Sequence, residues 1–323
     1  MKQQNFLFVD IISSFFLLLI LIGNFMGLLY ITEGNIALSL LGSLVLVVCY
    51  YFAVEQLKKN KEAMYRNNFL HKSAVFWLFF LVLSYVSFNL MAHFINVEYN
   101  CKNQIKAEAT AKLNLVDSIA EVYKKRAKTD LANFEAEIKT KLLIYKNTNS
   151  NVLRNELVAE PYNVAASGLN NPTFINVNEV ANAKVTPYAT KIAANIENIQ
   201  KTINDARPKY QSVFYNWKRF SLVETYAKLN QYVEDNVTLI NAKIAELPLD
   251  KSQIPKPHFQ KQLPLNSPSE LTILYKPNYW IPIIFIILTH LFLLIPFFTH
   301  KIKGYTGNSK EIDPLEIENV REI

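Results

Sequence analysis

The sequence predicts an all-α membrane protein with four transmembrane helices, three in the N-terminal part and one near the C-terminus, and a mostly helical external domain. Two observations support this fold class. Hydrophobic residues make up 50% of the 323-residue chain and are concentrated in four long blocks. The interval between the third and fourth blocks instead mixes charged residues with apolar residues at helical spacing, which is typical of amphipathic helices in water.

Each apolar block is about as long as the roughly 20 residues needed to cross a hydrocarbon core. The blocks lie at 11–31, 36–54, 73–97 and 279–299, and none contains Asp, Glu, Lys or Arg. They divide the chain into a three-span region (1–97), an external domain (98–276), a fourth span (278–299) and a tail (300–323).

Basic residues near the spans predict the orientation, because Lys and Arg in short loops favour the cytoplasmic side. Five of them lie in the second connection, 55–72, and Lys301 and Lys303 follow the last span. The first connection, 32–35, has none. We therefore expect both termini and loop 55–72 in the cytoplasm, and residues 98–276 outside.

Aromatic residues stand near the predicted span ends, where Trp and Tyr favour the headgroup layer. Those we expect to anchor the spans are Tyr30, Trp77, Tyr279 and Trp280, with Tyr50 and Tyr51 in similar positions. The alternative is ordinary abundance, since 13% of the chain is aromatic.

Small residues in the first two spans predict close helix packing. Gly23 and Gly27 form a GxxxG motif, a spacing that lets helices approach closely in membranes. Ser39, Gly42 and Ser43 form a second small patch in the next span. Because only residues 32–35 connect the two spans, we expect an antiparallel hairpin packed through these patches.

Polar side chains within or beside the spans are candidates for function, because such groups are costly in lipid. They are Asp10, Asn24, Asn89, His93 and His290. Asp10 and His93 lie near a membrane surface, and His290 fits equally well as a neutral group hydrogen-bonded to another helix. Ion transport would require a connected chain of such groups.

The external domain begins with a predicted stalk helix, 98–146. Its apolar residues recur every 3.6 positions on average from Ile105 through Leu131 to Tyr145, and no Gly or Pro occurs between Ser73 and Lys146. The third span and the stalk are therefore expected to form one helix, although a bend at the membrane surface would leave the same pattern.

The rest of the external domain is predicted to contain further helices and a candidate short β pairing. Residues 147–187 look irregular, with a candidate strand at 173–177, and Pro187 and Pro208 bound the next helix. The proline-rich segment 248–277 is expected to return to the membrane as a strap, with a second candidate strand at 271–275.

We expect no enzyme activity and no cofactor or metal, because the chain has no phosphate-binding loop, dinucleotide fingerprint, zinc-protease motif or C-x-x-C motif. Net charge is +7. The basic residues of the external domain are mixed with acidic ones rather than forming a stripe, so we expect no nucleic-acid partner.

The layout resembles the TssN family, inner-membrane components of the type VI secretion system of Bacteroidota. The resemblance rests on "GNFMGLLYITEGN", "EQLKKNKEAMYRNNFLHK", the stalk and "YKPNYWIPIIFIILTHLFLLIPFF". It implies a structural subunit in the bacterial inner membrane, a periplasmic 98–276 domain, other envelope secretion proteins and cytoplasmic baseplate components as partners, and a homo-oligomer. The alternative is a transmembrane sensor with a periplasmic helical input domain.

Overall fold

The computed structural model describes residues 8–62 and 69–300 of the chain, and all regular structure within these ranges is helical. The tail from residue 301 and residues 63–68 of the basic loop lie outside the described residues. The chain divides into two compact units, which are described separately. The membrane unit comprises 1–28, 37–95 and 277–323, and the outer unit comprises 29–36 and 96–276.

The membrane unit is built from α1 (Phe8–Ile31), α2 (Ile36–Glu62), α3 (Phe69–Ile95), α10 (Trp280–Leu293) and α11 (Ile295–Thr299). Four helical segments of the described chain are long and apolar enough to cross a membrane, which confirms the predicted fold class. One core cluster of this unit includes Ile20, Tyr50, Phe80 and Leu293. Apolar side chains on the same helices, such as Leu41 and Leu78, remain exposed, which fits helices that could cross a membrane.

Helical residues run without a break from Phe69 to Thr148. Between α3 and α4 (Lys102–Thr148), residues Asn96–Cys101 form a π-helical segment, where the hydrogen bonding widens by one residue. The boundary between the two units falls at this segment.

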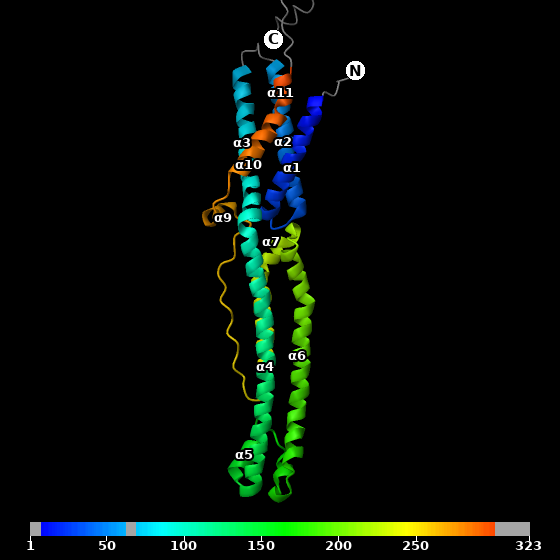
Figure 1. Ribbon diagram of the computed structural model, residues 1–323, viewed down its shortest axis with the longest axis vertical. Helices are drawn as coiled ribbons and strands as arrows, with labels where there is room; N and C mark the ends of the chain where they lie inside the picture. The colour runs from blue at the N-terminus through cyan, green and yellow to red at the C-terminus, as the bar shows by residue number, and fades with distance from the viewer. Residues whose placement is uncertain (1–7, 63–68, 301–323) are drawn as a thin grey trace, which may run out of the picture. The chain divides into compact units, whose positions relative to one another are not determined.

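The outer unit is centred on α4, which packs along α6 (Val177–Tyr215) and α8 (Leu229–Ile244). Figure 1 shows α4 and α6 as the two long helices of this unit. The buried face of α4 follows the predicted stripe from Ile105 to Tyr145 with two differences: Lys112 is also buried, and Asp130 is buried where Leu131 was expected. Short elements complete the unit: α5 (Asn151–Val158), η2 (Ala166–Leu169), η3 (Pro172–Phe174), α7 (Arg219–Ala227) and α9 (Pro268–Leu274).

The two prolines predicted to bound a helix instead lie inside α6. That helix begins ten residues before Pro187, because the Asn176 side chain accepts a hydrogen bond from the Glu179 N–H and caps it there. Each proline removes one backbone hydrogen bond, but packing along α4 outweighs the loss.

The predicted β pairing was wrong. Residues 271–275 lie mostly in α9, whose Leu271 is fully buried, and residues 173–177 run from η3 into the start of α6. Pro268 at the first turn favours a helix there, and short apolar runs do not distinguish strand from helix. The strap itself has no helix or strand from Asp250 to Pro264.

Candidate functional site

The GxxxG face of α1 packs against α3. A Cβ added at Gly27 would lie 2.4 Å from the backbone oxygen of Leu90, and one at Gly23 would lie 2.3 Å from Cε of Met91. At Gly27 only a residue without a side chain allows this approach, because the neighbouring atom belongs to the backbone. The α3 helix, and not the small patch of α2, is therefore the partner of this face, which corrects the expectation from sequence.

The small patch of α2 packs separately. Gly42 faces Leu28 of α1, with a built Cβ 3.0 Å from its Cδ1. Ser39 and Ser43 are fully buried, and the Ser43 hydroxyl donates to the carbonyl of Leu40 at 2.9 Å. Within this patch, Gly42 contacts α1. The glycines of α1 instead contact α3.

A buried polar chain connects three helices of the membrane unit. The Tyr50 hydroxyl of α2 lies 2.8 Å from Nε2 of His290 in α10 and 3.1 Å from the Ser87 hydroxyl in α3. The other ring nitrogen, Nδ1, lies 2.6 Å from the Ile286 carbonyl oxygen. A carbonyl can only accept, so Nδ1 carries a proton. The chain fastens the fourth span to the second and third.

Two tyrosines expected at the membrane surface are buried instead: Tyr30 and Tyr50 are each 0% exposed. Trp77 is half-buried against Phe80 and Phe297. Tyr279 and Trp280, by contrast, are 42% and 73% exposed at the start of the last span. Proximity to a span end therefore did not distinguish an anchor from a packing residue.

The other polar groups of the spans differ in their exposure. Asn24 and His93 are buried, whereas Asn89 is exposed and donates to the carbonyl of Tyr85. The side chain of Asp10 lies outside the described part of the chain. The linked polar chain given by the described residues is the one through Tyr50, Ser87 and His290.

A single buried carboxylate accepts several hydrogen bonds at the residues where the outer unit begins. Glu98, in the π-helical segment, has an 8% exposed side chain and accepts from Arg219 Nε at 2.6 Å and Nη2 at 3.1 Å. The Tyr30 hydroxyl donates to the same carboxylate at 2.7 Å. Burial alone would raise the pKa of Glu98, but the hydrogen bonds from Arg219 and Tyr30 outweigh it and lower the pKa.

The turn between α1 and α2 is fixed to the same unit. Gly34 has a φ of +87°, and a Cβ there would lie 2.7 Å from the carbonyl oxygen of Phe220. Glu33, beside it, accepts from the Asn266 amide at 2.8 Å. Glycine is therefore required both by the backbone conformation and by the approach of α7.

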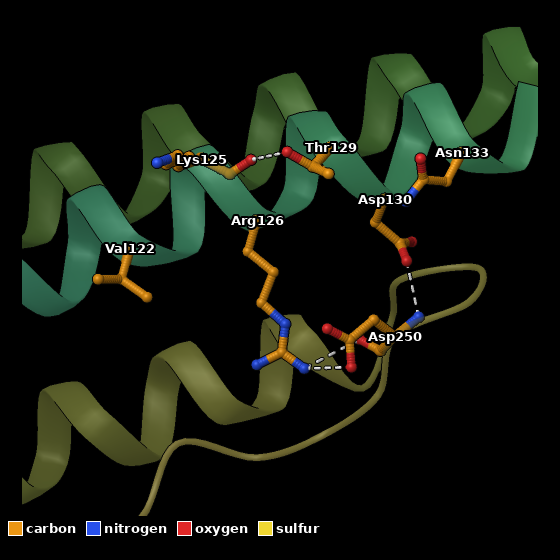
Figure 2. A pocket seen from close by; sticks show the side chains of 7 residues that line it. All are labelled: Val122, Lys125, Arg126, Thr129, Asp130, Asn133 and Asp250. Carbon is orange, nitrogen blue, oxygen red and sulfur yellow. Dashed lines mark hydrogen bonds and ion pairs between the residues drawn. The ribbon is translucent and has the colours of Figure 1, made fainter.

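The start of the strap is fastened to the middle of α4 (Figure 2). The Asp130 carboxylate accepts from the backbone N–H groups of Leu249 at 3.2 Å and Asp250 at 2.7 Å. Arg126 pairs with the Asp250 side chain. The hydrogen bonds from Arg126 and Ser252 lower the pKa of Asp250 to about 2. An open recess of about 300 Å³ lies beside these residues and Val122.

Sequence reasoning missed Glu98, Asp130, Arg219 and the role of Tyr50, although it allowed for a hydrogen bond from His290 to another helix, which the structure shows. A signal was present for Asp130, because it occupies a position on the apolar stripe of α4. Glu98 and Arg219 are 121 residues apart in sequence, and neither stands out from the many charges around it.

These sites hold helices together; among the described residues, no group of three or more His, Cys, Asp or Glu side chains is placed to hold a metal. The fold and sites define a helical protein with four span-length helices and an outer helical unit inserted before the last of them. Comparison with protein-family models, curated proteins and solved structures finds no match for this chain.

Proposed function

We propose that this chain is a structural, non-enzymatic subunit of the bacterial inner membrane, with both termini in the cytoplasm and the outer unit in the periplasm. The main support for this proposal is the unbroken helix from Phe69 to Thr148, which begins as a span-length apolar segment and ends in the outer unit. A continuous helix with a fastened base suits a part that bears load, whereas a flexible linker would not.

The complex we propose for it is an envelope-spanning secretion apparatus of the type VI kind, in which the subunit links periplasmic and cytoplasmic partners. Support comes from the resemblance of its layout to TssN and from the outer unit being tethered at both ends by span-length helices. The basic loop at 55–72 and the tail at 300–323 would make the cytoplasmic contacts, and the subunit would act as a homo-oligomer.

Extraction of the tagged full-length protein from native membranes in a mild polymer tests the proposal, with size analysis and mass spectrometry. We expect a large assembly that contains several copies of this chain and secretion components. A lone monomer without partners would exclude the scaffold. Glu98→Gln should weaken the assembly, whereas the matched surface change Glu224→Gln should leave it intact, because Glu224 and its partner Lys228 are both exposed.

The second candidate is a transmembrane sensor, and the recess beside Arg126 and Asp250 is the feature that favours it. A sensor would shift its thermal stability or oligomeric state when a periplasmic small molecule is added. The two candidates differ in one measurement, because a scaffold keeps its assembly regardless of such molecules.

A further inference from the structure

Apolar side chains are exposed at one end of the outer unit. In α9, Ile273 is 83% exposed and Leu274 is 58% exposed. The same unit also exposes Phe220, at the start of α7 and 51% exposed, and Tyr99, in the π-helical segment and 71% exposed. We call these four residues the collar. Exposed apolar groups that gather in one region mark a surface that water does not cover in the working protein.

Contacts within the outer unit place the collar at the level where the spans end. The turn between α1 and α2 joins two span-length helices through residues 32–35, so it marks a membrane surface. The carbonyl of Phe220 lies against Gly34 of this turn, and Asn266, just before α9, donates to Glu33.

The other end of α9 is fixed close to a second span end. The Asn96 amide donates to the carbonyl of Tyr275 at 3.1 Å, and the Asn100 amide donates to that of Lys276 at 3.4 Å. Asn96 directly follows α3. Since a chain with four crossings brings the first turn, the end of the third span and the start of the fourth to the same side, all these contacts lie at one surface.

One side of α9 is buried in the outer unit, and another side is exposed. Leu271 is fully buried in the outer unit, whereas Ile273 and Leu274 remain uncovered. The polar edge carries Glu270, which pairs with Lys261 at 3.3 Å. A short helix with a buried, a polar and an apolar side, held beside span ends, fits the boundary between headgroups and acyl chains.

We propose that the collar inserts into the outer leaflet, with α9 lying on the bilayer as an interfacial helix. The occupant of the exposed apolar surface is then lipid. This inference rests on the membrane arrangement proposed above but not on the secretion role, because it uses only the crossings and the contacts of the outer unit.

The chain offers a matched control for the test. Phe174 is 84% exposed, almost the same as Ile273, but it lies beside Leu143 and Lys146 near the C-terminal end of α4, at the opposite end of that helix from Glu98. Leu81, 59% exposed in α3, serves as a reference within a span.

The experiment places an environment-sensitive fluorophore at Ile273→Cys, Leu274→Cys, Phe174→Cys or Leu81→Cys in full-length protein that carries Cys49→Ala. Cys101 can remain, because it is fully buried and burial raises the pKa of its thiol to about 11, so it labels poorly. Each protein is reconstituted into vesicles of phosphatidylethanolamine and phosphatidylglycerol. Quenching by a doxyl lipid labelled near its headgroup is compared with quenching by aqueous iodide.

Labels at positions 273 and 274 should be quenched by the doxyl lipid at least about twofold more than the label at 174, and iodide should show the reverse order. If positions 273 and 274 behave like 174 while 81 is quenched by lipid, the collar faces water and the inference is overturned. If 81 also escapes lipid quenching, the membrane arrangement itself fails, and the collar fails with it.

Discussion

The membrane unit and the outer unit hold their helices together by different means. In the membrane unit, close backbone approach at Gly27 combines with an uncharged hydrogen-bonded chain through Tyr50. In the outer unit, an apolar stripe along α4 is supplemented by carboxylates that accept several hydrogen bonds, at Glu98 and Asp130.

The membrane arrangement proposed above accounts for this difference, because the two units would then lie in different solvents. Lipid tails are as apolar as leucine, so burial of leucine against leucine gains little there, and helices associate through dispersion contacts and hydrogen bonds. In water, burial of the stripe supplies the driving force at roughly 25 cal/mol per Å². A carboxylate with several donors can then be tolerated at the edge of that core, because each of its oxygens is hydrogen-bonded.

Gly27→Leu tests the membrane side of this comparison and should have the largest effect. The new side chain would meet the backbone of Leu90, which cannot rotate away, so α1 must separate from α3 at a cost of about 3 kcal/mol. Thermal unfolding in detergent, followed by size-exclusion chromatography, should show a clearly lower midpoint.

Gly168→Leu is the matched control, because nothing lies within 4 Å of a Cβ built at that glycine. Its midpoint should stay at the wild-type value. Equal losses in the two variants would show that the packing of α1 on α3 has no special role.

Glu98→Gln tests the outer side. The amide cannot form the charge-assisted pair of hydrogen bonds with Arg219, and we expect a loss of about 2 kcal/mol in the stability of the outer unit. Hydrogen exchange with mass spectrometry on the full-length protein should show faster exchange in peptides covering 96–104 and 219–227. Glu224→Gln, at an exposed pair, should leave both peptides unchanged.

The same carboxylate predicts a pH dependence. Folding lowers the pKa of Glu98 below its ordinary value of 4.5, so the folded state binds its proton less readily than the unfolded state. Its contribution is therefore complete above that value and lost as the pH falls below it. Protection of the 96–104 peptide should fall on acidification in the wild type and should change less in Glu98→Gln.

Asp130→Asn should release the strap. An amide nitrogen would replace one of the two accepting oxygens, which leaves one N–H of Leu249 or Asp250 without a partner at a cost of about 1.5 kcal/mol. Limited proteolysis should then cut the strap sooner within 250–264. Asp205→Asn, at an exposed position on α6, is the control, and equal cleavage in both variants would contradict the anchor.

Much of the fold could be predicted from the sequence because its signals are local. An apolar block gives a span, and apolar residues such as Ile105 and Tyr145 give the buried face of α4. The prolines of α6 and the two candidate strands were misjudged because their structure depends on non-local contacts. Whether Pro208 ends a helix, or Leu271 lies in a helix rather than a strand, depends on packing against segments distant in sequence.

The sites were harder to predict, since each depends on a partner far along the chain. Gly27 was predicted to pack closely, but its partner was sought in the neighbouring span because the connection is short, and it proved to be Leu90. Tyr50 looked like a surface anchor because it stands near a span end. Only the fold brings His290, 240 residues away, to its hydroxyl.

Tyr50→Phe should have the smallest effect, and it sharpens the comparison most. The change removes the hydroxyl that hydrogen-bonds to Nε2 of His290 and to Ser87, while keeping the ring packed against Phe80. Hydrogen bonds between membrane helices average well under 2 kcal/mol, so we expect a loss of about 1 kcal/mol. Tyr51→Phe, at a 59% exposed ring, should cost nothing measurable.

Salt separates the two kinds of contact. Because no charge is involved, the stability lost in Tyr50→Phe should be the same at low and high salt, whereas the stability lost in Glu98→Gln should shrink as salt screens the ion pair. A salt-dependent Tyr50→Phe effect would mean that the two units do not differ in the way their contacts indicate.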